Sequence, residues 1–297
     1  MPNVLVIGSV NMDLVAQTDT FPRVGETLFG NAFATHAGGK GANQAVAAAR
    51  LGARVTIVGR IGRDAFGDEL KMRLEREKIE SRWLSVTEGA PTGIAVITVW
   101  RADNAILLIR GANAALAPRD LEAAESAFAA ADVVLAQLEV PLATVQRAAQ
   151  LAAQHGKPFL LNPAPAMALP DSLLARCTLL TPNEYELATA LGRPGAPWRS
   201  LLTLLPGRAV VTKGEDGAYY TDRSGALRHQ PGFRVKPVDT TGAGDTFNGA
   251  LAAYWHLGLP EAVRRACAAG ALSVTKPGAQ DGMPSAQELG AFLESAR

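Results

Sequence analysis

The sequence carries no strong net charge, no cysteine framework and no long apolar run. Its 29 basic and 28 acidic side chains give a formal net charge of +1, which offers no case for a nucleic-acid or membrane-surface protein. The two cysteines, Cys177 and Cys267, lie far apart and form no metal-spaced pair, so we expect buried free thiols in a reducing cytoplasm. No charged leader or apolar stretch of membrane length precedes Val4, and we therefore expect a cytoplasmic protein without a membrane anchor.

The composition is that of a folded α/β protein. Of the 297 residues, 48% are hydrophobic and 19% are charged, which is enough apolar material for a sizeable core and atypical of a disordered chain. Short apolar runs alternate with alanine-rich helical segments, and no internal repeat is visible. This alternation predicts a doubly wound, mostly parallel sheet whose ligands sit at the carboxyl ends of its strands.

The predicted elements follow one another along the whole chain, which we take as a single domain. Strands are expected at 4–8, 55–58, 93–99, 105–109, 133–136, 159–161, 178–180 and 209–211, with an antiparallel pair at 217–220 and 226–227. Helices are expected at 42–51, 65–78, 118–131, 141–155, 184–191, 198–205, 245–257, 260–275 and 285–296.

One part of the chain departs from this rhythm. The apolar runs at 93–99 and 105–109 flank the polar residues 101–104, which is a hairpin signal. Residues 14–36 are turn-rich, with short extended pieces at 14–15 and 27–29. We expect residues 14–36 and 92–110 to form a small separate sheet that acts as a lid over a site at the strand ends.

The strongest chemical signal is the loop-to-helix corner at Gly242, Ala243 and Gly244, which is followed by Asp245. The first amides of a helix lack internal partners and the peptide dipoles add there, so such a corner attracts anions. Asp245 would then be a base for a substrate hydroxyl beside a cradle for phosphate, as phosphoryl transfer to a sugar requires. The alternative is that Asp239 or Asp245 merely caps the helix.

A second glycine-rich corner, residues 38–44, also opens a helix. It fits neither the P-loop nor the dinucleotide pattern, which argues against a nicotinamide enzyme. Lys40 and Asn43 can donate to a polyol, although a tight turn with a solvated lysine is the better explanation of this segment taken alone. Asn11 and Asp13 follow the first predicted strand and fit either sugar hydroxyls or a capped turn.

Three further polar positions follow predicted strands. Glu139 can accept from a sugar hydroxyl or belong to a water network near a metal, although an isolated glutamate is more often a surface charge. Asn183 and Glu186 stand at capping-box spacing, or they lie near nucleotide phosphates where they organise hydrated Mg²⁺. The segment Thr212-Lys213-Gly214 resembles a nucleotide-contacting loop, and alone it is equally a hairpin turn.

Taken together, residues 38–44 and 239–249 resemble the paired signatures of the ribokinase-like (PfkB) carbohydrate kinase family. The similarity covers essentially the whole chain and includes residues 8–13, 111–116, 162–165 and 278–280. The resemblance implies a three-layer α/β/α domain with a β lid, homodimers formed through the lids, and transfer of the γ-phosphate of ATP to the 5-hydroxyl of ribose.

The resemblance also implies a role for each matching position. Those expected to bind the sugar are Asn11, Asp13, Gly39, Lys40, Asn43 and Glu139. Asp245 would be the base, and the amides of Gly242, Ala243 and Gly244 would form the anion hole. Those matching nucleotide positions are Asn183, Thr212, Lys213 and Gly214, while Asn183 and Glu186 match the motif linked to Mg²⁺ and phosphate.

An activating K⁺ is a further implication of the resemblance. The matching positions are Asp239, Thr241, Ser273, Gly278 and Gly282. Gly282 departs from the family pattern, in which a serine can add a side-chain oxygen, so one ligand is in doubt.

Other acceptors and other functions stay open at this point. The nearest alternative is a kinase of the same fold that acts on deoxyribose, fructose, 2-keto-3-deoxygluconate or a nucleoside. A non-catalytic sugar-binding regulator on the same scaffold is a further alternative, against which the intact Asp245 and its glycine corner argue. A nicotinamide dehydrogenase lacks its fingerprint here.

Overall fold

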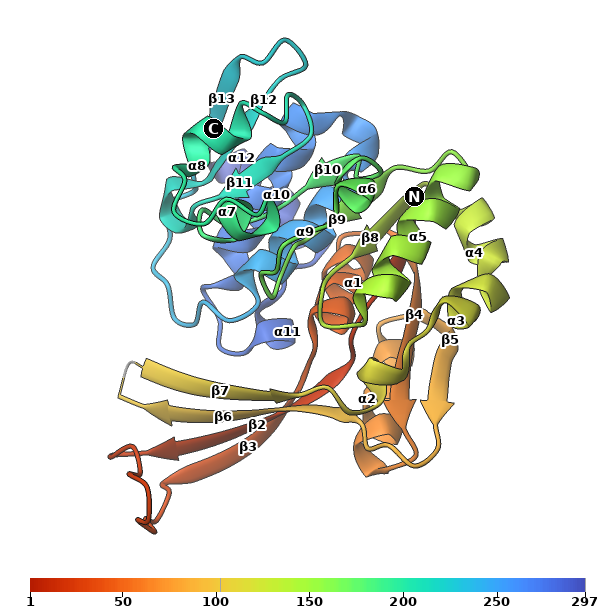
Figure 1. Cartoon of the computed structure of the whole chain (residues 1–297). Helices are drawn as coiled ribbons and strands as arrows, with labels where there is room; N and C mark the ends of the chain where they lie inside the picture. The colour runs from red at the N-terminus through yellow and green to blue at the C-terminus, as the bar shows by residue number, and fades with distance from the viewer. Residues whose placement is uncertain (102, 297) are drawn as a thin grey trace.

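A computed structural model of the chain describes residues 1–101 and 103–296. Its centre is a six-stranded parallel sheet in the order β10-β9-β8-β1-β4-β5 (Figure 1). These strands are β1 (Asn3–Ile7), β4 (Arg54–Gly62), β5 (Glu80–Thr87), β8 (Val133–Ala136), β9 (Phe159–Leu161) and β10 (Leu179–Leu180). A parallel bridge from Leu180 to Ala209 leads into an antiparallel sheet of β11 (Val210–Thr212), β12 (Ala218–Thr221) and β13 (Leu227–Gln230).

Helices cover both faces of the central sheet, because its strands are apolar on both sides. Along β1, Val4 and Val6 belong to one buried core while Leu5 and Ile7 belong to another. The helices that contribute to the first core are α1 (Lys40–Arg50), α2 (Ala65–Arg76), α9 (Ala243–Ala253), α10 (Leu259–Ser273) and α12 (Ala286–Ser295). Those of the second are α3 (Pro118–Ala123), α4 (Glu125–Ala130), α5 (Leu142–Gln154), α6 (Asp171–Leu174), α7 (Glu186–Ala190) and α8 (Trp198–Leu202). The predicted doubly wound, three-layer fold is confirmed.

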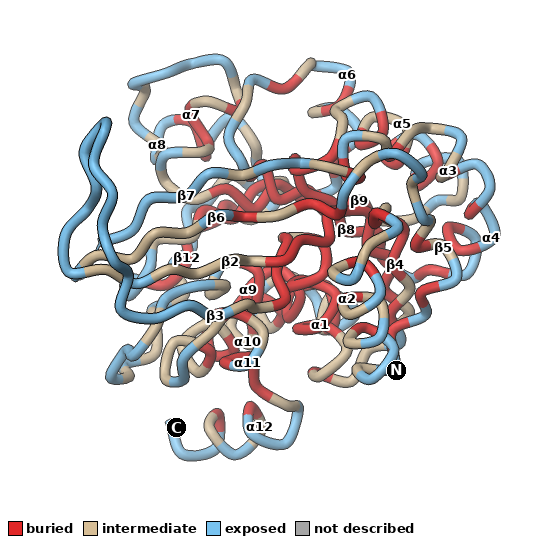
Figure 2. The backbone as a smooth tube through the Cα atoms, turned by 90° about the horizontal axis from the view of Figure 1, so that it is seen from below, coloured by how far each residue is buried: buried red, intermediate tan, exposed pale blue. Residues whose placement is uncertain are grey.

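A four-stranded outer sheet projects from the main body in the order β3-β2-β6-β7 (Figure 1). Its strands are β2 (Asn11–Thr18), β3 (Ala32–Gly38), β6 (Gly93–Trp100) and β7 (Asp103–Ile109). β2 pairs antiparallel with β3 and parallel with β6, and β6 pairs antiparallel with β7. Figure 2 shows the strands buried where they join the body and exposed toward their far ends. Ala102, within the expected hairpin turn, lies outside the described residues.

Several expected elements differ in the structure. The extended piece expected at 27–29 is not a strand, and β3 lies at 32–38 instead, where its many alanines give little hydrophobic contrast. β5 was not predicted, because its charged residues hide an edge strand whose buried positions include Ser81 and Leu84. The helix expected at 118–131 is broken into α3 and α4. None of the helices in the described part of the chain is long and apolar enough to cross a bilayer.

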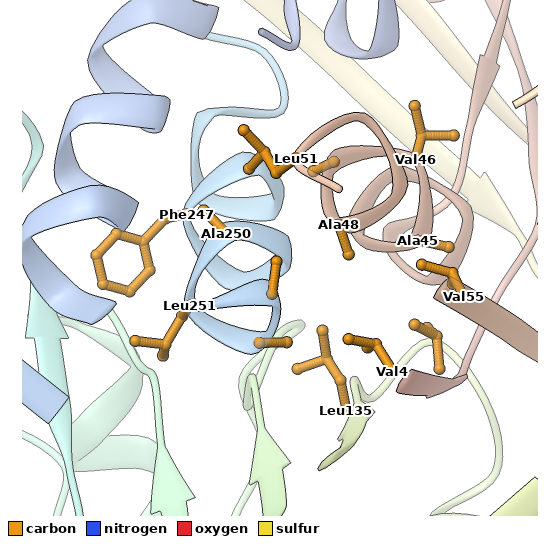
Figure 3. Close-up of a cluster of buried hydrophobic side chains, with 14 of the residues drawn as sticks. Val4, Ala45, Val46, Ala48, Leu51, Val55, Leu135, Phe247, Ala250 and Leu251 are labelled. Carbon is orange, nitrogen blue, oxygen red and sulfur yellow. The ribbon is translucent and has the colours of Figure 1, made fainter. Parts of the chain in front are cut away.

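The helices α1 and α9 pack at unusually short range beside the sheet. Figure 3 shows Ala48 of α1 and Leu51, which directly follows that helix, beside α9, whose Ala250 and Leu251 belong to the same buried core. A Cβ on Gly249 would stand 2.5 Å from the carbonyl oxygen of Gln44, so only glycine fits at this crossing. The close crossing lets side chains from the first turn of α1 reach the first turn of α9.

Short 3₁₀ and α segments complete the chain. They are η1 (Gly111–Ala115), η2 (Gly214–Asp216), η3 (Trp255–Leu257) and α11 (Ala279–Gly282). The helix expected at 245–257 begins at Ala243 and ends at Ala253, with η3 as a separate turn.

Candidate active site

Asp245 lies in the first turn of α9 and is held by two amides from α1. Its side chain is buried, with Asn43 Nδ2 donating to Oδ2 and Gln44 Nε2 donating to Oδ1, both at 2.9 Å. Each carboxylate oxygen therefore has one fixed donor, which sets the rotation of the carboxylate. Lone pairs remain on both oxygens for a further partner.

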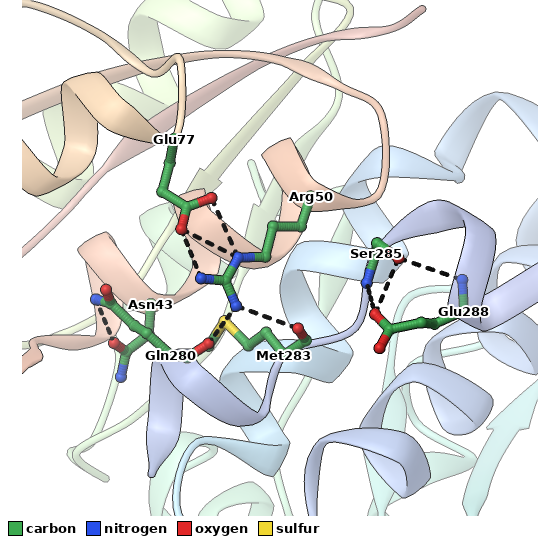
Figure 4. A network of polar contacts seen from close by, with 7 residues as sticks. All are labelled: Asn43, Arg50, Glu77, Gln280, Met283, Ser285 and Glu288. Atoms are coloured by element: carbon green, nitrogen blue, oxygen red, sulfur yellow. Dashed lines mark hydrogen bonds and ion pairs between the residues drawn. The ribbon is translucent and has the colours of Figure 1, made fainter. Parts of the chain in front are cut away.

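The orientation of the α1 amides follows from the carboxylate itself. An ionised carboxylate only accepts, so Asn43 and Gln44 must turn their NH₂ groups toward Asp245 and their oxygens away. The Asn43 oxygen then accepts from Gln280 Nε2 at 2.9 Å (Figure 4), and the Gln44 oxygen accepts from Gln137 Nε2 at 2.6 Å.

On the sheet side, the network ends on backbone and on the helix that carries the base. Gln44 Nε2 also donates to Asn162 at 3.1 Å, and Asn162 in turn donates to the carbonyl of Thr181 at 3.1 Å. The Thr181 hydroxyl bonds to Asn248, which donates to the carbonyl of Gly244 at 2.8 Å. These contacts link the ends of β9 and β10 to the first turn of α9.

The corner before Asp245 has the backbone expected of an anion site. Gly242 caps α9 in the left-handed region at φ 75°, where a Cβ would stand 2.9 Å from the Cβ of Ala279. At Gly244 a Cβ would meet no heavy atom within 4 Å, so the corner is open there. The amide of Ala243 donates to the carbonyl of Thr240 at 3.3 Å.

The five positions expected to bind sugar, besides Asn43, gather on the same side of α1. Glu139 Oε2 accepts from Ser9 Oγ at 2.5 Å and from the backbone amide of Lys40 at 3.1 Å. The Asp13 carboxylate lies over Gly38, where a Cβ would stand 2.3 Å from Oδ2. Gly39 has φ +87° and approaches the backbone of Asn11 closely, so glycine is required.

Asn11 is oriented by a buried partner at the base of the outer sheet. Asn113 Nδ2 donates to Asn11 Oδ1 at 2.7 Å, while Asn113 Oδ1 accepts from the backbone of Val10 at 2.9 Å. With its oxygen satisfied, Asn11 has its NH₂ group free to donate to a ligand oxygen.

Lys40 lies among acidic groups, and these charges shift the pKa values in the site. Asp245 raises the pKa of Lys40 most, burial lowers it, and Glu139, Glu186 and Asp13 raise it further. Burial raises the pKa of Asp13 to about 7, with help from the charges of Glu139 and Asp245. The pKa of Glu186 is raised as well, chiefly by burial. The site is therefore a compact set of carboxyl groups around one ammonium.

At the positions expected to bind the nucleotide, the residues form the capping box and the turn that were the alternatives to ligand binding. Asn183 and Glu186 form a capping box, with the Asn183 amide donating to Glu186 Oε2 and the Glu186 amide to Asn183 Oδ1, both at 2.8 Å. A parallel bridge places Thr212 beside Asn183, and Lys213 closes the turn into β12 through Gly217. The Lys213 ammonium pairs with Asp216 at 2.6 Å, and Gly214 begins η2. Neither arrangement removes these groups from reach of a ligand.

The expected K⁺ positions lie on two adjoining segments. Asp239 accepts from the amide of Thr241 at 2.9 Å and from that of Gly278 at 2.8 Å. A Cβ on Gly282 would stand 2.5 Å from the carbonyl oxygen of Ser273, so a serine there would require this backbone to shift. Across residues 1–101 and 103–296, no three His, Cys, Asp or Glu side chains are grouped to hold a metal ion.

Several residues that shape this site were not assigned a role from the sequence. They are Ser9, Gln44, Asn113, Gln137, Asn162 and Gln280. Ser9, Gln137 and Asn162 each stand within two residues of the end of a parallel strand. Because ligand sites form at that edge of the sheet, their position was a usable signal. Gln280 lies in the matching segment 278–280, but nothing local gives its side chain a role, because its partner is 237 residues away.

Comparison with known proteins agrees with this geometry. The sequence profile described as pfkB family carbohydrate kinase matches residues 1–286. The chain belongs to this family. The pfkB assignment confirms the family resemblance found in the sequence.

Individual pfkB relatives match over their full length. A ribokinase of Bacillus subtilis is 40% identical, with 99% of this chain and 100% of that protein covered. A deoxyribokinase of Salmonella typhi is 38% identical over 98% of each. Among solved structures, ribokinase from Thermotoga maritima has a TM-score of 0.90 at 32% identity, covering 99% of this chain and 100% of that one. Arabidopsis thaliana ribokinase complexed with ribose and ATP has a TM-score of 0.91 at 29% identity and 99% coverage of both.

The raised pKa of Asp13 predicts a pH-dependent stability of this pfkB kinase. Because the pKa rises from 3.8 in the unfolded chain to about 7, the folded protein binds more protons between these values. Its stability therefore falls as pH rises through that window. Asp13→Asn should raise the free energy of unfolding at pH 8 by about 1–3 kcal/mol, with the gain shrinking toward pH 4.

Urea denaturation of both proteins at several pH values would measure this effect. Asp222→Asn is the matched control: hydrogen bonds from Ser224 and Arg228 lower the pKa of Asp222 to about 2, so its removal should give no gain at pH 8. A pH-independent difference between Asp13→Asn and the unmodified chain would contradict the prediction.

Proposed function

We propose that this kinase transfers the γ-phosphate of ATP to the 5-hydroxyl of D-ribose, giving ribose 5-phosphate. The observation that carries the proposal is the buried Asp245, held on both oxygens at the glycine-lined start of α9. The full-length similarity to ribokinases, one of them complexed with ribose and ATP, supports the choice of both substrates. The supply of ATP and the buried free thiols Cys177 and Cys267 fit a cytoplasmic location.

Asp245 acts as the general base in this proposal. The 5-hydroxyl donates its proton to a carboxylate oxygen as the hydroxyl oxygen attacks the γ-phosphorus, and the bond from the γ-phosphorus to the β,γ-bridging oxygen breaks to release ADP. Asn43 and Gln44 hold that carboxylate in place, so no reorientation is needed during the reaction. In this proposal the backbone amides of residues 242–244 donate to the developing negative charge on the transferred phosphoryl group, and the Ala243 amide gives up its 3.3 Å bond to the carbonyl of Thr240 to do so.

The sugar is held by a mixed set of donors and acceptors. The NH₂ groups of Asn11 and Asn43 and the ammonium of Lys40 donate to hydroxyl oxygens, while Asp13 and Glu139 accept from hydroxyl hydrogens. Gly39 lets the start of α1 come close to the backbone of Ser9 and Asn11, which brings these sugar-binding groups together.

The nucleotide is held at the ends of β10 and β11. Asn183, Thr212, Lys213 and Gly214 contact ATP in this proposal, supported by the bridge between Asn183 and Thr212. Mg²⁺, when bound with ATP, would offset phosphate charge, and the half-buried carboxyl of Glu186 beside Asn183 is a group that would hold it through water.

K⁺ would bind beside the anion corner at Asp239, Thr241, Ser273, Gly278 and Gly282. Backbone carbonyls suit a large cation, and hydrogen bonds from Thr241 and Gly278 keep the pKa of the Asp239 carboxyl low against the opposing effect of burial. Gly282 supplies no side-chain oxygen, so we expect fewer ligands than a serine would give.

In this proposal the outer sheet has two roles: it is a lid over the sugar site, and it forms the dimer interface of the protein. It carries exposed apolar side chains on both faces: neighbouring residues Ile106 and Leu107 are 59% and 66% exposed, and Phe33 is 67% exposed. Alternate residues of a strand face opposite sides, so one face can close over the sugar and the other can pack against a second copy.

Replacing Asp245 tests the catalytic assignment. Asp245→Asn preserves the size of the side chain and one of its two amide contacts but loses the base, which should lower kcat by about 10²–10⁴-fold. Coupled ADP release with ribose, deoxyribose, fructose, 2-keto-3-deoxygluconate and a nucleoside, with and without K⁺, measures the acceptor preference and the cation effect. Near-normal turnover by Asp245→Asn, or ribose-independent ADP release by the unmodified chain, would reject the proposal.

Deoxyribose is the second candidate acceptor, because deoxyribokinases match this chain about as well as ribokinases do. A higher kcat/KM for deoxyribose than for ribose in the same assay would transfer the assignment to that sugar.

A charge on the lid should separate the proposed dimer. Leu107→Lys places an ammonium at the apolar contact, and its desolvation would shift the protein toward a monomer in analytical ultracentrifugation. Leu204→Lys, at a site 52% exposed outside the outer sheet, is the control and should leave the sedimentation coefficient unchanged. A protein that is monomeric before any substitution would refute the interface.

A further inference from the structure

Gln280 reaches the catalytic helix pair from the far end of the chain. It lies on α11, and its Nε2 donates to Asn43 Oδ1 at 2.9 Å, as Figure 4 shows. Asn43 Nδ2 donates in turn to Asp245 Oδ2 at 2.9 Å. The three side chains therefore form one directed chain of hydrogen bonds that ends on the proposed base.

The direction of this chain matters because a carboxamide has one donor end and one acceptor end. If Asn43 turned over, its oxygen would face the Asp245 carboxylate, and two acceptors would oppose each other at a buried position. A donor on the Asn43 oxygen favours the productive orientation, and Gln280 is the side chain that provides it.

The helix carrying Gln280 is too short to be stable alone and is fixed from outside. α11 has four residues, well below the length at which a helix holds itself. Arg50 Nη1 donates to the carbonyl of Gln280 at 2.5 Å and to that of Met283 at 3.2 Å. Arg50 belongs to the last turn of α1, the helix that also carries Asn43.

Arg50 is itself held by a carboxylate. Its Nε and Nη2 donate to Glu77 in a fork, with a shortest distance of 2.5 Å, and both side chains are about a quarter exposed (Figure 4). The fork leaves Nη1 directed at the α11 carbonyls. The chain that follows α11 is also fixed, because Ser285 and Glu288 form the capping box that starts α12.

We propose that Gln280 and Arg50 are positioning residues for the phosphoryl transfer. Gln280 keeps the Asn43 amide turned toward Asp245, and Arg50, held by Glu77, keeps α11 where Gln280 can do so. Neither residue contacts substrate. The inference rests on the proposed role of Asp245 as the base.

Two substitutions of Gln280 separate orientation from simple loss of a contact. Gln280→Met removes the donor, so the Asn43 oxygen no longer accepts a hydrogen bond from position 280. Gln280→Glu at pH 8 places a second acceptor there, which attracts the Asn43 NH₂ group away from Asp245. We expect kcat to fall about threefold in Gln280→Met and about 10- to 100-fold in Gln280→Glu, a size typical of small misplacements near the reacting groups.

The pH dependence supplies a readout that a merely structural role would not give. A protonated Glu at position 280 is again a donor, so the deficit of Gln280→Glu relative to the unmodified enzyme should shrink as pH falls toward 5.5. The deficit of Gln280→Met should stay constant. Equal and pH-independent deficits in the two variants would overturn the proposal.

Arg50 is tested through its coupling to Gln280. Arg50→Met should lower kcat, and Arg50→Lys should lower it less. The double variant Arg50→Met/Gln280→Met should be no slower than the slower of the two single variants, because both residues act through one contact. Arg73→Met, which removes a surface ion pair of α2 with Glu69, is the matched control and should leave kcat unchanged. Additive losses in the double variant would remove Arg50 from the proposal.

The proposed function and this inference fail differently. If the unmodified chain phosphorylates no sugar, the proposed function is wrong and the inference falls with it. If the unmodified chain is active and the Gln280 variants behave alike at every pH, only the inference is wrong.

Discussion

The close crossing of α1 and α9 is the constraint on which the site depends. Gly249 leaves no room for a side chain against the backbone of Gln44, and Gly41 likewise would place a Cβ 2.6 Å from the backbone of Gly8 and Ser9. These contacts hold the first turn of α1 between the end of β1 and the first turn of α9. The amides of Asn43 and Gln44 can therefore reach the carboxylate of Asp245. The fold itself thus holds both oxygens of the base in place.

The same geometry gathers charges of opposite sign in a small, partly desolvated volume. Lys40 is surrounded by acidic groups that raise its pKa, and the pKa of Asp13 is raised to about 7. The carboxylates that would bind sugar hydroxyls repel one another, which costs folding stability above neutral pH. A polyol offers hydrogen bonds to these groups, so part of that cost would be offset when the sugar binds.

Sequence reasoning found the fold and the family where the signal was local, and it failed where the signal was long-range. The alternation of apolar runs and alanine-rich helices was sufficient for the three layers, and the glycines beside Asp245 mark a corner that stays a predicted anion site. β3 and β5 were missed because exposed or edge strands show weak hydrophobic contrast. Asn183 and Glu186 do form the capping box that was the structural alternative, so sequence spacing alone could not separate the two roles. Gln280 and Arg50 were missed because their contacts join segments more than 200 residues apart.

The structure of a complex with ribose and a non-hydrolysable ATP analogue would test the central claim most directly. The account predicts an Asp245 carboxylate oxygen about 2.6–3.2 Å from the 5-hydroxyl oxygen, the distance required of a general base. It also predicts that this hydroxyl faces the γ-phosphate at the start of α9. A carboxylate turned away from the sugar, with another group at the 5-hydroxyl, would contradict the account.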